Sequence, residues 1–184
     1  KGGATFNRQP DGSWLPSGKN PPHDVYEIQA PLPAGMFAGI LLDCLPDDRT
    51  PQKSLGRYSN GNFVLTRVEA EIRPSAGKVA PVKLTRREAD YSQKKWDISM
   101  VNNGNPGNGW AVDGPTRRKP IKAMFLPDSL VKIPKGSSLV VRFIHETLNQ
   151  HNMGRFRVSY SQENVKSLDG KPGLPANLSA LLRK

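Results

Sequence analysis

The sequence predicts an all-β protein, specifically an antiparallel β-sandwich of the jelly-roll, galactose-binding-like type. Three observations support this fold class. Apolar and polar residues alternate in short runs, as they do in half-buried strands. The 17 Gly and 17 Pro are spread over the 184 residues and divide them into short segments. No long apolar pattern at helical spacing separates successive runs, which disfavours a parallel βαβ architecture.

Nine runs are predicted to be strands. The clearest extends from Val64 to Ile72, where every second residue is apolar or Thr and the charged residues Arg67, Glu69 and Glu71 face the other way. The other eight, in chain order, are Ala4 to Asn7, Val25 to Gln29, Ala38 to Cys44, Val79 to Leu84, Trp96 to Met100, Ile121 to Leu126, Leu139 to His145 and Arg155 to Tyr160. The turns between runs are expected at the dipeptides Asp11-Gly12, Asn60-Gly61, Asn103-Gly104, Asp113-Gly114 and Asp169-Gly170.

The expected organisation is one sandwich domain over residues 1–162, followed by a C-terminal linker over 163–184. Residues 175–182 of the linker favour a short helix that would connect to a following domain. The chain starts Lys1-Gly2-Gly3 without a methionine or a signal peptide, so we expect it to be a piece of something longer.

Charge narrows the classes of partner. The chain has 27 Lys and Arg against 16 Asp and Glu, a formal net charge of +11. Such a surplus attracts polyanions, which leaves nucleic acid, acidic or sulfated glycans and acidic proteins open, beside a role in solubility alone. Nucleic acid is disfavoured because no interleaved aromatic and basic sheet motif is present. No run approaches the ~20 apolar residues of a membrane span.

Enzymatic chemistry is not expected. The three histidines, His23, His145 and His151, lack metal-ligand spacing, and no nucleophile elbow, Walker loop or dinucleotide fingerprint is present. His145 lies in a predicted strand and is expected to be structural. Cys44, the only cysteine, lies in an apolar run and is expected to be a buried, inert thiol. No cofactor is therefore expected, except that Asp47 and Asp48 could bind a structural calcium ion or could form a solvated turn.

The predicted loops contain polar and aromatic residues that suit a glycan. An aromatic ring stacks on the C–H face of a sugar, while Asn and Arg side chains hydrogen-bond hydroxyl, carboxylate or sulfate groups. The candidate ligand-binding residues are Arg57, Tyr58, Asn60, Trp96, Asn103, Asn105, Trp110, Arg117, Arg118, Lys119 and His151. For Trp96 and Trp110 a place in the core is the alternative, and for His151 a structural role is equally open.

Several motifs occur in one order: Asp11-Gly12-Ser13, Leu41 to Pro46, Gly56-Arg57, Asn60 to Leu65, Gly109 to Val112, and His151 to Ser159. Together they resemble a carbohydrate-binding-like domain found inside large planctomycete proteins that also carry cytochrome c-type domains. The resemblance covers nearly the whole chain, from Asp11 to Tyr160. It implies a galactose-binding-like jelly roll that is exported, to the periplasm or the cell surface, and a polysaccharide ligand.

Within this resemblance, Arg155 and Arg157 share one strand face with Ser159. They are expected to pair with Glu69 or Glu71 on a neighbouring strand.

Two functional hypotheses follow. The first is a non-catalytic carbohydrate-binding module, for an anionic or sulfated polysaccharide, within a larger exported protein. The second is a structural module that contacts neighbouring domains or associates with copies of itself through an exposed apolar patch.

Overall fold

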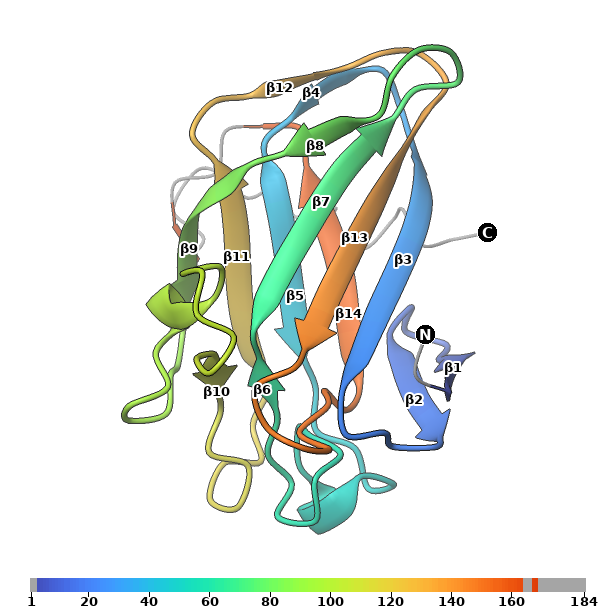
Figure 1. The fold of residues 1–184 in the computed structure, drawn as a ribbon. Coiled ribbons are helices and arrows are strands. Elements are labelled where there is room, and N and C mark those ends of the chain that lie inside the picture. Colours follow the sequence, from blue (N-terminus) through green and yellow to red (C-terminus); the bar gives the residue numbers. More distant parts are fainter. Residues whose placement is uncertain (1–2, 164–166, 169–184) are drawn as a thin grey trace.

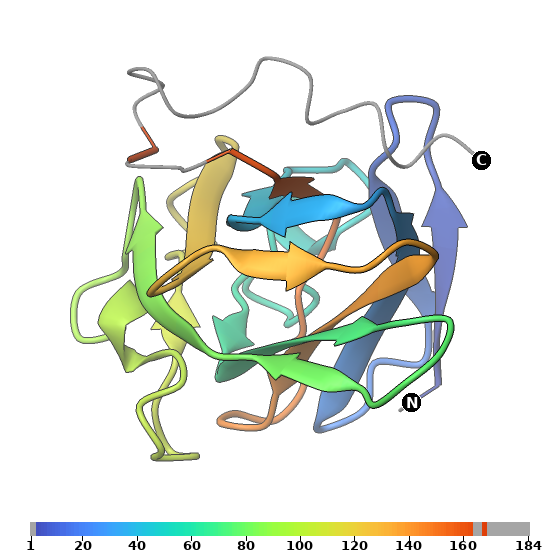
Figure 2. The same ribbon diagram turned by 90° about the horizontal axis from the view of Figure 1, so that it is seen from above.

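Two antiparallel sheets face each other in the computed structural model, which describes residues 3–163 and 167–168 (Figures 1 and 2). The larger sheet has the order β1-β2-β14-β5-β11-β9, formed by β1 (Ala4–Arg8), β2 (Trp14–Gly18), β14 (Phe156–Ser161), β5 (Gly39–Cys44), β11 (Ile121–Pro127) and β9 (Leu84–Ala89). The smaller sheet has the order β3-β13-β7-β8, formed by β3 (Asp24–Leu32), β13 (Ser137–His145), β7 (Arg67–Arg73) and β8 (Ala80–Val82).

Four short strands pair outside these sheets. They are β6 (Val64–Leu65) with β10 (Trp110–Ala111), and β4 (Gly35–Phe37) with β12 (Val131–Ile133). The predicted all-β, antiparallel sandwich is confirmed; its jelly-roll connectivity stays a prediction.

The core lies between the two sheets, where the period-two pattern places it. On β7 the side chains of Val68, Ala70 and Ile72 are buried, whereas Arg67 and Glu69 are exposed. Ile40 and Leu42 on β5 are buried in the same cluster. Burial of apolar surface, which stabilises the fold by about 25 cal/mol per Å², is the main favourable contribution of such a core.

One predicted strand is wrong. Residues 96–100 contain a short 3₁₀ helix, η2 (Ile98–Met100), because the Asp97 side chain accepts a hydrogen bond from the Ser99 N–H and turns the chain. The predicted strand 64–72 is divided at Thr66, so that β6 pairs with β10 while β7 pairs with β13. The chain from 175 to 182, predicted to be helical, lies outside the described residues.

The predicted partners of two arginines are also wrong. Arg157 on β14 pairs with Asp43 on the adjacent β5, and its Nη2 lies 2.8 Å from the carboxylate. Arg155 pairs with Asp11 and Asp47. Glu71 pairs instead with Arg142 and Arg73, since β7 neighbours β13 and does not neighbour β14.

Candidate functional site

Trp110, predicted to contact ligand, lies in the core. Its side chain is 0% exposed, and its ring packs edge-to-face on Phe63 with centroids 5.4 Å apart. Its indole N–H donates a hydrogen bond to the Tyr91 carbonyl oxygen at 2.9 Å. The buried Trp110 side chain cannot contact a ligand, so this prediction is wrong. Its hydrogen bond holds the backbone of Tyr91 instead.

Three other candidates, Arg57, Tyr58 and His151, are brought together, but they contact each other and the protein backbone. The rings of Tyr58 and His151 stack at 3.9 Å, which covers one face of each. Arg57 donates a hydrogen bond to the Gly18 carbonyl oxygen, and Asn60 accepts one from the backbone N–H of Asn62. These contacts stabilise the loop and leave fewer groups for a ligand.

The glycine- and asparagine-rich loop stabilises its own turns. Asn103 and Asn105 are exposed, and their side-chain oxygens accept hydrogen bonds from the backbone N–H groups of Asn105 and Gly107. Trp96 is half-buried and lies apart from this loop in sequence. Asn103 and Asn105 carry no charge, so this loop adds no cation to attract an anionic ligand.

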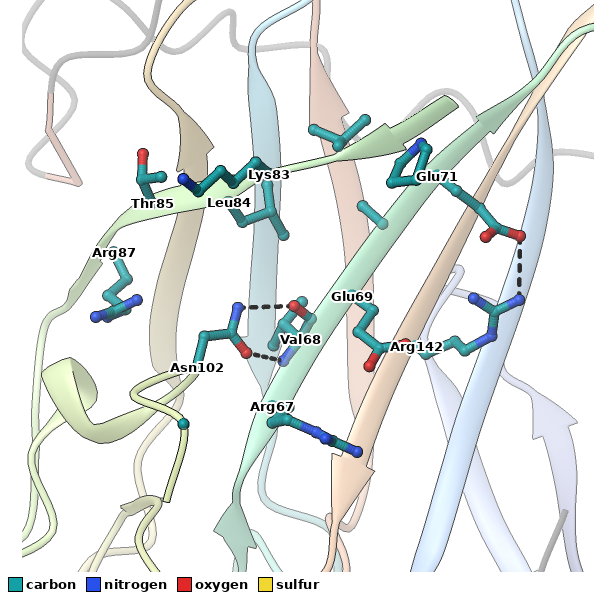
Figure 3. A pocket seen from close by; sticks show the side chains of 14 residues that line it. Arg67, Val68, Glu69, Glu71, Lys83, Leu84, Thr85, Arg87, Asn102 and Arg142 are labelled. Atoms are coloured by element: carbon teal, nitrogen blue, oxygen red, sulfur yellow. Dashed lines mark hydrogen bonds and ion pairs between the residues drawn. The ribbon is translucent and has the colours of Figure 1, made fainter. Parts of the chain in front are cut away.

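A groove of about 700 Å³ lies beside this loop, between β7 and the segment that forms β8 and β9 (Figure 3). Two of its arginines are already paired, Arg142 with Glu71 and Arg67 with Glu146. Glu69 and Lys83, of opposite charge, make no ion pair with any other described residue. Because both signs of charge are present and no aromatic side chain among residues 3–163 and 167–168 lines it, the groove suits neither a polyanion nor a stacked sugar.

The predicted basic residues Arg117, Arg118 and Lys119 line one open cleft of about 540 Å³, together with Tyr91, Pro115 and Thr116. We call it the basic cleft. Among the described residues, no acidic side chain lines it. Within residues 3–163 and 167–168, the charged groups of these three residues have neither a hydrogen bond nor an ion pair. The guanidinium carbon of Arg117 lies 3.5 Å from the centroid of the Tyr91 ring.

Arg118 also lines a second cleft, with Pro46, Asp47, Asp48, Arg49, Lys53 and Arg155. There the acidic groups are paired: Asp47 accepts hydrogen bonds from Arg49 at 2.7 Å and Arg155 at 3.4 Å, and Asp48 lies 3.5 Å from Lys53. The hydrogen bond from Arg49 lowers the pKa of Asp47 to about 2. A calcium ion at Asp47 would have to displace both guanidinium groups, which weakens the calcium hypothesis.

Buried polar residues fix the loop that carries the basic cleft. The Asn62 side-chain oxygen accepts hydrogen bonds from the N–H groups of Val112 and Gly114, and the Ser54 hydroxyl donates one to the Gly114 carbonyl oxygen at 2.7 Å. A Cβ at Gly114 would lie 2.1 Å from the Gly61 carbonyl oxygen, so only glycine fits. The loop is thus positioned before any ligand binds.

Sequence reasoning missed the supporting residues of this cleft, Tyr91, Ser54 and Asn62. The turn dipeptides Asn60-Gly61 and Asp113-Gly114 are visible in the sequence. The contact between the two turns is not, because the hydrogen bond from the Gly114 N–H to the Asn62 side chain joins residues that are 52 positions apart. A contact between two loops leaves no periodic pattern in the sequence from which it could be predicted.

Comparison of the chain with protein-family models, with curated proteins and with solved structures gave no match. None of the helices in the described part of the chain has the length and apolar character needed to cross a membrane.

Proposed function

We propose that the chain is a non-catalytic carbohydrate-binding module that binds an anionic polysaccharide at the basic cleft. The observation that carries the proposal is the cleft's charge: three basic side chains, Arg117, Arg118 and Lys119, converge, and no acidic residue of the described part of the chain lines the cleft. Cations that lack a protein partner keep their full attraction for an external anion.

The remaining features agree with a polymeric ligand. Because Arg118 lines both clefts, a chain bound in the basic cleft can continue into the second one. The net charge of +11 favours the approach of a polyanion at low ionic strength. Export, a galactose-binding-like jelly roll and neighbouring domains in a longer chain belong to the proposal through the resemblance alone.

Affinity electrophoresis tests the proposal. The chain is run in gels containing dextran sulfate, polygalacturonate or neutral dextran, beside a variant with Arg117, Arg118 and Lys119 changed to Ala. A matched control removes three exposed charges elsewhere, Lys78→Ala, Lys132→Ala and Lys135→Ala. Retardation by a polyanion should be lost in the first variant and kept in the control.

Two results would overturn the proposal: equal losses in both variants, which would show a nonspecific charge effect, or no retardation of the unaltered chain. Light scattering after size-exclusion chromatography, without any sugar, tests the alternative of a self-associating module, which requires oligomers.

A further inference from the structure

Arg117 differs from the other two cations of the basic cleft in how it is held. Its guanidinium carbon lies 3.5 Å from the Tyr91 ring centroid, well within the ~6 Å limit of a cation–π contact. Arg117 is half-buried, whereas Arg118 and Lys119 are exposed and contact no ring among the described residues. The Arg117 side chain is thus held by a ring contact that Arg118 and Lys119 lack.

Both members of the Arg117–Tyr91 pair are anchored from the protein side. The Tyr91 carbonyl oxygen accepts the hydrogen bond from the buried Trp110 indole. The Arg117 N–H donates to the Asp113 carbonyl oxygen at 3.0 Å, and the Arg117 carbonyl oxygen accepts from the buried Ser54 hydroxyl at 3.1 Å. The backbone of both residues is therefore held by the protein itself, and only the ring contact positions the guanidinium.

The ring contact occupies a face of the guanidinium and leaves the N–H groups on its perimeter free. A planar guanidinium presents these donors as a fork that matches two oxygens of one carboxylate or sulfate. The same contact covers a face of Tyr91, so a sugar ring cannot stack there. Tyr91 acts as a support for the arginine.

We infer that Arg117, held against Tyr91, binds the anionic substituent of the polysaccharide through two parallel hydrogen bonds. The ligand class is an oxyanion with two free oxygens on one centre, a carboxylate or a sulfate ester. Arg118 and Lys119 contribute charge without this geometry. The inference rests on the proposed function and names the residue that determines its specificity.

The experiment compares Arg117→Lys with Arg118→Lys, both of which keep the charge. Dissociation constants for dextran sulfate and polygalacturonate are measured by affinity electrophoresis at several polymer concentrations, and unfolding midpoints confirm that each variant is folded. A Lys side chain cannot donate two parallel hydrogen bonds to one oxyanion or lie flat on the Tyr91 ring. Arg117→Lys should therefore weaken binding about tenfold, a change of about 1.4 kcal/mol. Arg118→Lys should change it less than about twofold.

The role of Tyr91 is tested by coupling. Tyr91→Phe keeps the ring and should weaken binding less than Tyr91→Leu, which removes it. In an Arg117→Lys background, Tyr91→Leu should cause no further loss, a result that a merely structural role would not give. If the unaltered chain binds and Arg117→Lys binds equally well, the inference is wrong and the proposed function stands. If the unaltered chain binds neither polymer, both fail.

Discussion

The side-chain amide of Asn102 hydrogen-bonds both backbone groups of Val68: its Nδ2 donates to the carbonyl oxygen at 2.8 Å, and its Oδ1 accepts from the N–H at 2.8 Å (Figure 3). The strand β8 pairs with β7 only from Ala70 to Ile72. Asn102 therefore takes the place of a neighbouring strand where β8 no longer covers β7. Uncovered strand edges invite association with other chains, and this contact closes one.

Asn102→Ala should lower the free energy of unfolding by about 1 to 3 kcal/mol, because both Val68 groups lose their partner in a part-buried position. Urea unfolding followed by circular dichroism measures the change. Asn105→Ala, in the exposed part of the same loop, is the matched control and should stay within about 0.5 kcal/mol. Equal effects of the two substitutions would show that Asn102 has no special role.

His145 should make stability depend on pH in the mildly acidic range. Burial lowers its pKa from 6.5 to about 4, while nearby Asp24 opposes the shift. The folded chain keeps the ring neutral and the unfolded chain protonates it. The contribution is therefore complete above about pH 6.5 and is lost as the pH falls towards 4, by about 3 kcal/mol in all.

Unfolding measured across this range should show the loss in the unaltered chain and a flatter profile in His145→Gln, whose amide can still accept the hydrogen bond from the Met153 N–H. The exposed His23 provides the control, since His23→Gln should keep the original slope. A slope unchanged by His145→Gln would contradict the assignment.

Asp47 should govern stability at lower pH. Its pKa is lowered from 3.8 to about 2, chiefly by the hydrogen bond from Arg49, so its stabilising contribution is present above about pH 4 and is lost as the pH falls through 2. Allowing for solvent screening, we expect about 1 kcal/mol. Asp47→Asn should remove this part of the acid dependence, whereas Asp48→Asn, whose side chain is 87% exposed, should not.

Cys44 should be unreactive until the chain unfolds. Its side chain is 0% exposed, its thiol lies 3.8 Å from the Met153 sulfur, and burial raises its pKa well above the usual value. Because the thiolate is the reactive form, labelling with a thiol reagent at neutral pH should be negligible in buffer and complete in denaturing urea. Rapid labelling of the folded chain would contradict the buried position.

The sequence predicted most of the longer strands, although β2 and nearly all of β9 were not predicted. The alternation around Val68 and Ile72 predicted both the strand and its buried face, and the apolar run at Cys44 predicted an inaccessible thiol. The strands β4, β10 and β12, of two or three residues, were missed because so short a segment has no period. For residues 96–100, the local hydrogen bond of Asp97 outweighed the strand propensity.

For the site, the local sequence was enough to identify Arg117, Arg118 and Lys119 as three consecutive basic residues. It could not separate the core role of Trp110 from a ligand-binding one, since an aromatic residue beside a polar loop suits both.

The sequence by itself determined the fold class, the inward face of the longer strands and the basic character of the chain, because side-chain period and charge are local properties. Only the tertiary structure decided which charges are paired, which ring is buried and which arginine rests on Tyr91. These depend on contacts between distant segments, such as Ser54 with Gly114 or Trp110 with Tyr91, whose distances are set when the two sheets and their loops assemble.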